Sequence, residues 1–508
     1  MDATIKTRQG ALRGALVGGV YAWLGVPYAA PPFGSNRFLP PQPVAPWSGV
    51  RDAQSLGAEP FQLRPDPQTQ ALVPDPAVPG EDCLNLNIWS PSPGSSGLPV
   101  LVWIPGGMFE VCSAASYDGS RFARDGVVCV TINYRVGAEG FLYLGDGTAN
   151  LGLLDQLAAL AWVQDNIAAF GGDPDNVTVF GESAGAMSIG TLLSMPRAQG
   201  RFRRAIAQSG AAHQVQSAAS ARRIGQRLAE RLGVAASRAA LTEVPIERLL
   251  AAQAELKGEI IAHPDPERWG PEVVTSLLPW QPVVDGEVVP AAPIQRIAAG
   301  AGAQVDVLVG SNTEDWKLFL VVSGQLAQVT EPILRGPVAT HGHLSLLSYG
   351  LPADQIDRAL AAYRAAAPGA SPGELLAAVQ TDWWCRIPAV RLAEAHAAST
   401  AGTFLYEFAW PSPAFGGLLG ACHALEIPFV FDTLDKGPDQ MLGPLLGPTP
   451  PQPLAATVHA AWVAFARSGH PGWPRYEPAR RATMRFGTPS RVVDDPRAHE
   501  REIWEGIR

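Results

Sequence analysis

The sequence predicts a large α/β domain with a doubly wound, mostly parallel sheet. Two apolar runs, PVLVWIPGG (99–107) and VVCVTINYR (127–135), are typical of buried parallel strands, and the first ends in glycines that open a loop. Residues 151–170 then place apolar side chains at helical spacing, and Gly171-Gly172 stops the helix. Strands that alternate with helices in this way form sheets whose sites lie beyond the carboxyl ends of the strands.

Further elements continue the alternation along the chain. The β-favouring residues 177–180 (VTVF) are predicted to form a strand, and residues 184–195 (AGAMSIGTLLSM) have helical character. No internal repeat is visible, and we expect residues 1–508 to form a single domain with helical insertions. The other expected elements are strands at 205–210 and 305–311, Ala-rich helices at 220–256, and Pro- and Gly-rich loops at 63–80 and 436–453.

Composition excludes several classes of protein. Of the 508 residues, 47% are hydrophobic and only 17% are charged, which predicts a soluble globular protein with a sizeable core instead of a disordered chain. The formal net charge of -9 is modest for this length, and no run of Lys and Arg is present. Nucleic acid is therefore not an expected partner.

No targeting or membrane segment is visible in the sequence. The first residues lack an apolar stretch of the signal-peptide kind, and no apolar run reaches the roughly 18 residues of a membrane span. The five cysteines are odd in number and lack C-x-x-C spacing, which argues against a disulfide framework and against a zinc site. We predict a cytoplasmic protein that has no membrane partner and needs neither metal nor cofactor.

Ser183 stands in a five-residue pattern that carries chemistry in some α/β proteins. The pattern is Gly181-Glu182-Ser183-Ala184-Gly185, with a predicted strand before it and a predicted helix after it. A nucleophilic serine on a sharp strand-to-helix turn needs such small neighbours. A packing turn needs them as well, so these residues alone leave both interpretations open.

A base and an acid must follow the serine if it is a nucleophile of the α/β-hydrolase type. All nine histidines come after Ser183, and His423 differs from the rest because it sits in a small-residue loop before an apolar segment. Glu314 and Asp315 come directly after the predicted strand 305–311, where an acid belongs. By position alone, neither acid is preferred.

Long segments of the chain resemble the type-B carboxylesterases, the group that also contains the cholinesterases. The resemblance runs from about residue 5 to residue 504 and is most specific around Ser183. It implies an α/β-hydrolase fold and an ester-hydrolysing activity. The segments are GVPYAAPPFGSNRFLPP (25–41), GEDCLNLNIWSP (80–91), TINYRVGAEGF (131–141), residues 150–188, QPVVDG (281–286) and HALEIPFVF (423–431).

The resemblance also implies roles for individual residues. Ser183 becomes the nucleophile and His423 the general base and acid. The family acid stands three residues beyond an Asn in a G-x-N-x-[DE]-E pattern, which places Asp315 in that role. This chain has Glu and Asp swapped relative to the family pattern, so Glu314 is the alternative.

The family's oxyanion hole maps onto two backbone segments. One donor is the N–H of Ala184, and the others are Gly107 and Met108 in the loop IPGGMFE. The chain departs from the family at Pro105, commonly His or Tyr, and at Met108, commonly Gly or Ala. Neither change removes a donor, but Met108 is expected either to point into the pocket and narrow it or to fold back against the loop.

Further residues of the family pattern are expected to lie behind the triad or near the N-terminus. A buried polar network, with either a structural or a catalytic role, is implied for Glu182, Ser209 and Glu426. Arg37 is expected to form a structural ion pair with Glu81.

The predicted function is hydrolysis of uncharged esters with short to medium acyl groups, through a Ser183-Asp315-His423 triad and an acyl-enzyme. Activity should appear near the ordinary histidine pKa of roughly 6.5. A catalytically silent binding protein is disfavoured because the triad is intact. A cholinesterase-like enzyme for cationic esters is disfavoured because residues 72–82 (LVPDPAVPGED) contain no aromatic side chain. A small-molecule ester is the expected partner, and monomer and small homo-oligomer both stay open.

Overall fold

A large twisted sheet forms the centre of the computed structural model, which describes residues 3–64, 67–72, 76, 78–94 and 97–508. Within these residues thirteen strands join in the order β1-β2-β3-β5-β7-β6-β8-β9-β12-β13-β14-β15, with β4 beside β2. The strands are β1 (Ala3–Lys6), β2 (Ala11–Val17), β3 (Val20–Pro27), β4 (Val50–Asp52), β5 (Asn85–Ser90), β6 (Leu98–Ile104), β7 (Val128–Ile132), β8 (Gly172–Glu182), β9 (Arg204–Gln208), β12 (Asp306–Asn312), β13 (Thr403–Phe408), β14 (Ala482–Phe486) and β15 (Arg491–Asp494). The short strands β10 (Gln216–Ser217) and β11 (Val283–Val284) pair separately.

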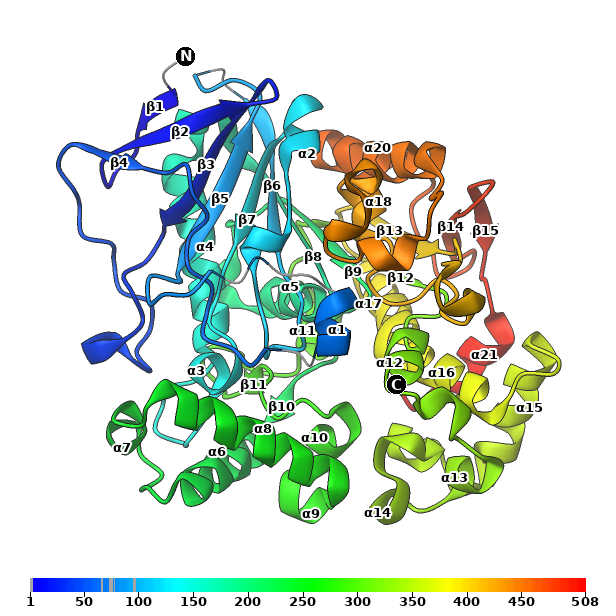
Figure 1. Ribbon diagram of the computed structural model, residues 1–508. Coiled ribbons are helices and arrows are strands. Elements are labelled where there is room, and N and C mark those ends of the chain that lie inside the picture. Colours follow the sequence, from blue (N-terminus) through cyan, green and yellow to red (C-terminus); the bar gives the residue numbers. More distant parts are fainter. Residues whose placement is uncertain (1–2, 65–66, 73–75, 77, 95–96) are drawn as a thin grey trace.

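The middle of the sheet is parallel, and its two ends are antiparallel except for the parallel pair β2-β4. Every pair from β7-β6 to β13-β14 is parallel, whereas β1-β2, β2-β3, β3-β5, β5-β7 and β14-β15 are antiparallel. The N-terminal strands lie at one end of the sheet and the C-terminal strands at the other (Figure 1). The predicted doubly wound, mostly parallel sheet is therefore confirmed.

The sheet separates two hydrophobic cores, which explains why its central strands are apolar on both faces. Along β6, Val100, Val102 and Ile104 pack in one core, and Leu101 and Trp103 between them pack in the other. Successive side chains of a strand point to opposite faces, so both faces must be covered by helices. Helices α5 and α20 both contact β6 and β8.

Twenty-one α-helices surround the sheet in the described residues. The first are α1 (Pro67–Leu72), α2 (Ser120–Arg124), α3 (Gly137–Phe141), α4 (Leu151–Asn166), α5 (Ala184–Ser194), α6 (Ala218–Leu232), α7 (Arg238–Thr242), α8 (Ile246–Ala262), α9 (Pro266–Trp269), α10 (Pro271–Ser276) and α11 (Pro293–Ala298). The others are α12 (Lys317–Val322), α13 (Glu331–Arg335), α14 (Val338–His341), α15 (Ile356–Ala366), α16 (Pro372–Thr381), α17 (Ile387–His396), α18 (Ile427–Val430), α19 (Gly443–Leu446), α20 (Gln452–Ser468) and α21 (Ala498–Ile503). None of the helices in these residues combines the length and the hydropathy that crossing a membrane requires.

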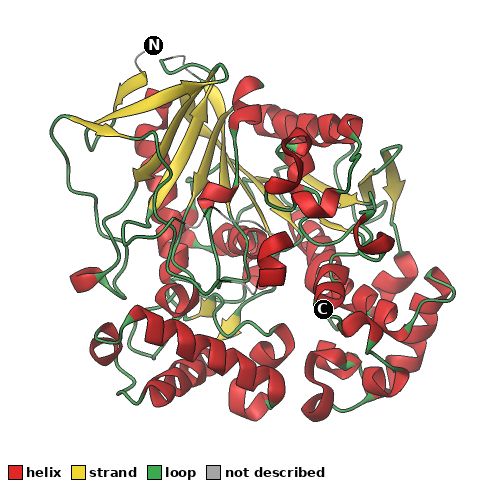
Figure 2. Cartoon of the chain, viewed as in Figure 1, coloured by secondary structure: helices red, strands yellow, loops and turns green. Residues whose placement is uncertain are grey.

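Helix α6 shows how local sequence sets the bounds of the inserted helices. The side chain of Ser217 accepts a hydrogen bond from the backbone N–H of Ser220 and caps the start, and Gly233 ends the helix with a left-handed φ of 69°. Helices α6 to α10 gather on one side of the molecule beyond the sheet, beside α13 to α16 (Figures 1 and 2). They form the predicted helical insertions.

The predicted strands and the long helix at 151–170 are confirmed, but two loop predictions are incomplete. The range 63–80 lies partly outside the described residues, and its described part contains α1. The range 436–453 contains α19 and the first residues of α20. Helices α19 and α20 each have Pro in the first turn, where its missing N–H is tolerated. The prolines in this range had indicated a loop, but these two stand at the starts of helices.

Arg37 forms a buried ion pair with Glu139, so the expected pair with Glu81 is wrong. The Nε and Nη2 atoms of Arg37 donate to Oε1 of Glu139 at 2.9 and 2.7 Å. Glu81 is exposed. A buried guanidinium requires a buried carboxylate because an unpaired charge in the interior is costly.

Candidate active site

Ser183 occupies a strained turn between β8 and α5. Its backbone angles are φ 54° and ψ -122°, a conformation that typically costs about 1–3 kcal/mol in a residue other than glycine. Two backbone hydrogen bonds hold it: the N–H of Ser183 donates to Gln208 at 2.9 Å, and its carbonyl accepts from Met187 at 2.9 Å. The Ser183 side chain lines a cavity.

The two glycines of the turn are required for the packing of β8 and α5 against β6. A Cβ on Gly181 or on Gly185 would lie 2.6 or 2.0 Å from the carbonyl oxygen of Ile104 on β6. Any larger residue at these two positions would force α5 away from the sheet. The two glycines are therefore required by packing, whereas the side chain of Ser183 lines the cavity.

Asp315 and His423 meet beyond the end of β12. The Oδ1 atom of Asp315 lies 2.9 Å from Nδ1 of His423, and both side chains are buried. Two backbone N–H groups fix the aspartate: Asn312 donates to its Oδ2 at 3.0 Å, and His423 donates to its carbonyl at 3.1 Å. His423 lines the same cavity as Ser183. In the described residues Ser183 forms no hydrogen bond with His423, and such contacts often tighten only when substrate binds.

Glu314 points away from His423. Its Oε2 atom accepts hydrogen bonds from the backbone N–H of Ala421 at 2.9 Å and from the hydroxyl of Thr313 at 2.6 Å. These contacts tie the end of β12 to the loop that carries His423. The structure thus places Asp315, and not Glu314, against the imidazole.

The glycine loop lies directly against Ser183. A Cβ on Gly106 would stand 3.1 Å from the Cβ of Ser183. The next two residues have unusual backbone angles, with φ 121° at Gly107 and φ 56° at Met108. In the part of the chain that the structure describes, the backbone N–H groups of Gly107, Met108 and Ala184 donate no hydrogen bond, so they are free to bind an anionic oxygen.

Known proteins resemble this chain over nearly its whole length. A model of the carboxylesterase family matches residues 1–504. The chain is 35% identical to a para-nitrobenzyl esterase of Bacillus subtilis over 98% of its length and 97% of the relative. The carboxylesterase EST55 of Geobacillus stearothermophilus superposes with a TM-score of 0.82 at 37% identity, covering 99% of both chains. A solved para-nitrobenzyl esterase gives a TM-score of 0.83 at 33% identity, again covering 99% of both.

The chain belongs to the carboxylesterase family. It is an ester-hydrolysing enzyme, and the predicted α/β-hydrolase fold is confirmed.

Glu182 lies on the other side of the imidazole in this carboxylesterase. Its Oε1 atom lies 3.0 Å from Nε2 of His423, within ion-pair distance, and accepts no hydrogen bond from the described residues. Burial by itself would lower the pKa of His423, but Glu182, Asp315 and Cys385 outweigh it and raise that pKa well above 6.5. Burial, together with the charge of Asp315, raises the pKa of Glu182.

Glu426 joins the triad region through a chain of side-chain amides. Its carboxyl accepts hydrogen bonds from Asn312 at 2.6 Å and from Gln208 at 3.1 Å. Burial and the charges of Glu182 and Asp315 raise the pKa of Glu426 to about 8. Asn312 also donates to Asp315 through its backbone, so the network restrains the acid.

Ser209 is also buried near His423 but is linked to its neighbours differently. Its hydroxyl has no hydrogen-bond partner among the described residues, whereas its carbonyl accepts a hydrogen bond from the thiol of Cys385 at 3.5 Å. The polar network predicted around Glu182 and Glu426 therefore reaches Ser209 only through its backbone.

The cavity at Ser183 is narrow and mostly apolar. The space open to the centre of a water molecule is about 20 Å³. Ser183, His423 and Met108 were expected here from the sequence, whereas the other side chains of the wall were not. Those residues are Met187, Leu278, Trp316, Phe319, Trp384 and Cys385.

Some of these wall residues carried a signal in the sequence and others did not. Met187 stands four residues after Ser183 on α5, the spacing that puts two residues on one face of a helix. Trp316 directly follows Asp315, and its ring stacks on Trp384 with centroids 4.6 Å apart. Trp384 and Cys385 come from a π-helical turn at Asp382–Arg386, which no periodic pattern predicts.

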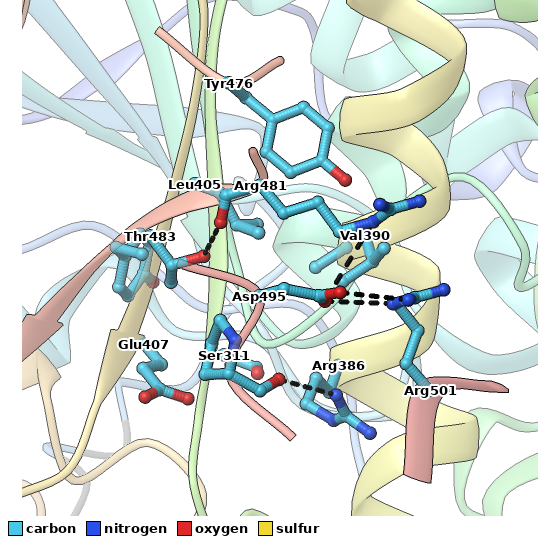
Figure 3. Close-up of a pocket in the computed structure, with 13 residues that line it drawn as sticks. Ser311, Arg386, Val390, Leu405, Glu407, Tyr476, Arg481, Thr483, Asp495 and Arg501 are labelled. Carbon is cyan, nitrogen blue, oxygen red and sulfur yellow. Dashed lines mark hydrogen bonds and ion pairs between the residues drawn. The ribbon is translucent and has the colours of Figure 1, made fainter. Parts of the chain in front are cut away.

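A second cavity, between β13, β14 and α17, has a different character (Figure 3). Arginine and acidic side chains face each other there, and Asp495 binds Arg501 through two contacts of 3.0 Å. Arg386 is paired with Asp382 at 2.6 Å. Because Ser183 and His423 line another cavity, this one is not the candidate active site.

Proposed function

We propose that this enzyme hydrolyses uncharged carboxylic esters with short to medium acyl groups, through a Ser183-His423-Asp315 triad in a single domain formed by residues 1–508. The observation that carries the triad is the convergence of these side chains. Ser183 and His423 line one cavity, and Asp315 lies 2.9 Å from the far nitrogen of the imidazole. A nucleophile, a base and a group that orients the base are the parts that acyl transfer requires.

In the first half of the reaction His423 accepts the proton of the Ser183 hydroxyl while the Ser183 oxygen attacks the ester carbonyl. Asp315 holds the proton on Nδ1, which leaves Nε2 as the base, and its charge stabilises the imidazolium. The tetrahedral oxygen becomes anionic, and the free N–H groups of Gly107, Met108 and Ala184 are the proposed donors that stabilise it. The alcohol leaves with the proton that His423 returns, and an acyl-enzyme remains.

In the second half a water molecule attacks the acyl-enzyme by the same route. His423 takes a proton from the water, the tetrahedral oxygen occupies the same donors, and Ser183 leaves with that proton. Apart from the ester and the water, the proposed steps use only groups of the chain. Glu182 and Glu426 act on the triad through charge and hydrogen bonds. Glu182 lies beside Nε2 of His423, but neither carboxylate takes a proton or forms a bond in this scheme.

The cavity wall supports the proposed substrate class. Apart from His423, every side chain that lines the cavity is uncharged, so an ionised acyl or alcohol group would lose its hydration without gaining an ion pair. The narrow space favours slim acyl groups. The aromatic rings of Trp316, Phe319 and Trp384 are the one feature that favours the alternative, because such rings can also hold a cation.

A panel of esters on the purified enzyme tests the proposal. Nitrophenyl esters of graded acyl length measure the acyl pocket, and nitrobenzyl esters belong in the panel because a para-nitrobenzyl esterase is among the similar proteins. The decisive pair is acetylcholine and its uncharged carbon isostere, 3,3-dimethylbutyl acetate. We expect kcat/KM to be higher for the isostere, and a clear preference for acetylcholine would overturn the substrate class.

A further inference from the structure

Cys385 is a buried thiol in the active-site cavity that the proposed mechanism does not use. It lies on the π-helical turn Asp382–Arg386 between α16 and α17, and it lines the cavity together with Ser183 and His423. Its side chain is fully buried. π-Helical turns inside longer helices occur frequently at functional sites.

Three residues that can ligate a metal converge at this thiol. One ligand atom each from Asp315, Cys385 and His423 lies within 4.8 Å of the other two, and all three side chains are buried. Sulfur, imidazole nitrogen and carboxylate oxygen are the donors that zinc binds in proteins. No other cluster of this kind is present among the described residues.

The geometry requires only a small adjustment to hold an ion. In a tetrahedral zinc site with bonds of about 2.0–2.3 Å, neighbouring ligand atoms lie roughly 3.5 Å apart. The Oδ1 of Asp315 and the Nδ1 of His423 are 2.9 Å apart, closer than this spacing, because they share a proton. An ion that replaces the proton must move these two atoms apart by roughly half an ångström, and the thiol, within 4.8 Å of both, must approach them. Ligand and ion can meet because Cys385 and His423 both line the cavity that opens at Ser183.

The backbone that carries the thiol is held firmly. Arg386 donates two hydrogen bonds of 2.6 Å to Asp382 within the turn, and the hydroxyl of Tyr363 donates a third of 2.6 Å to the same carboxylate. All three side chains are buried. The position of Cys385 is therefore set by a satisfied polar cluster, as a preorganised ligand requires.

We propose that Asp315, Cys385 and His423 form an inhibitory site for a soft divalent cation such as Zn²⁺ or Cd²⁺. On binding, the thiol releases its proton to the solvent and the proton on Nδ1 of His423 moves to Nε2, so that sulfur, Nδ1 and the carboxylate oxygen each share an electron pair with the ion. Thiolate and carboxylate neutralise its two positive charges, and no group changes oxidation state. Hydrolysis stops because the imidazole is no longer free to orient against Asp315 and accept a proton.

Direct binding and inhibition are measured on the same four proteins. These are the wild type, Cys385→Ser, Ser183→Ala and the control Cys129→Ser, whose thiol is buried on β7 in the other core. Cd²⁺ is added to each, and the ultraviolet absorption of the cadmium–thiolate bond reports ligation by sulfur. Inhibition by Zn²⁺ is expressed relative to the uninhibited rate of each active variant and is reversed with a chelator.

We expect the absorption band in the wild type, in Ser183→Ala and in Cys129→Ser, and its loss in Cys385→Ser. The concentration of Zn²⁺ that halves the rate should rise by about tenfold or more in Cys385→Ser, since even an outer partner of a metal ligand contributes 10- to 100-fold to affinity. Absence of the band in the wild type, or equal inhibition of Cys385→Ser and Cys129→Ser, would overturn the proposal. The band in Ser183→Ala does not depend on hydrolysis, so this result is independent of the proposed function.

Discussion

The carboxylate of Glu182 lies 3.0 Å from Nε2 of His423, on the side of the imidazole opposite Asp315. A negative charge at this distance favours the protonated ring, and Glu182 is the largest of the contributions that raise the pKa of His423. Glu182 directly precedes Ser183, so the proposed nucleophile and the group that raises the pKa of the proposed base are neighbours in the sequence.

The pH profile should reflect this contact. Only neutral His423 can act as base, so activity appears as the pH rises through its pKa. Because that pKa is raised, the limb in kcat/KM of the wild type should lie above 6.5, higher than the sequence alone predicted. Glu182→Gln removes the charge, lowers the pKa of His423 and should move the limb to lower pH.

Glu314→Gln is the matched control for that shift, because Glu314 contacts Ala421 and Thr313 and not the imidazole. It should leave the limb where it is in the wild type. An unchanged limb in Glu182→Gln, or the same shift in both variants, would show that Glu182 does not set the pKa of His423.

Ser183→Ala should abolish ester hydrolysis and leave the fold intact. The substitution removes one hydroxyl that faces the cavity and keeps the backbone contacts with Gln208 and Met187. Hydrolysis of a nitrophenyl ester and the thermal unfolding midpoint are measured together. Activity above about a thousandth of the wild type in a contaminant-free sample would contradict the assignment, since loss of a triad nucleophile typically costs more.

The two neighbouring carboxylates should differ sharply. Asp315→Asn destroys the acceptor for Nδ1–H of His423 and favours the wrong tautomer, so kcat should fall by a factor on the order of 10⁴, as the equivalent change does in serine proteases. Glu314→Gln should cost much less because only loop contacts change. Rates of both variants with one ester decide the matter, and the assignment fails if the larger loss falls on Glu314→Gln.

Gly185→Ala should destabilise the enzyme. The added Cβ would stand 2.0 Å from the carbonyl oxygen of Ile104, so α5 must move from the sheet and take Ser183 with it. Gly258→Ala is the control, because Gly258 is exposed within α8 and an added Cβ would meet no atom of another segment within 4 Å. We expect Gly185→Ala to lower the unfolding midpoint. Gly258→Ala should raise the midpoint slightly, because alanine in place of a helical glycine adds roughly 0.5–1 kcal/mol to the free energy of unfolding. Equal midpoints would contradict this account of the turn.

Features that depend on neighbours in the chain were predictable from the sequence. The strand of residues 177–180, the glycines around Ser183 and the start of α5 lie in one continuous segment, and the turn follows from their backbone demands. Register along the family pattern also selected Asp315 over Glu314, and the structure places Asp315 against His423. The alternation of β6 side chains between the two cores is equally local, since successive side chains of any strand point to opposite faces.

Features that depend on distant segments were not predictable in the same way. The partner of Arg37 is Glu139, some hundred residues away. The fold buries the guanidinium, which therefore needs a carboxylate that is buried beside it. Trp384 and Cys385 reach the cavity from a π-helical turn about two hundred residues after Ser183. No local periodicity in the sequence marks a π-helical turn, so these two residues of the cavity wall could not be predicted.

Met108→Ala should widen the cavity for bulky esters. Met108 lines the cavity beside Ser183, and its backbone N–H is one of the three proposed oxyanion donors. The side chain of a residue whose N–H faces the reacting oxygen stands close to the bound ester, so a flexible Met here restricts the acyl or alcohol group. Alanine keeps the donor and removes the obstruction.

The gain should appear as a higher kcat/KM for esters of branched acids or tertiary alcohols, by roughly tenfold, with acetate esters changed less. Met441→Ala is the matched control, because Met441 is also half-buried but lines a separate cavity with Tyr117 and Phe431. It should leave the ratio between bulky and slim esters unchanged. If Met108→Ala instead lowers kcat/KM equally for both classes, Met108 supports the oxyanion loop by packing and does not restrict the substrate, because loss of loop support weakens the transition state for every ester alike.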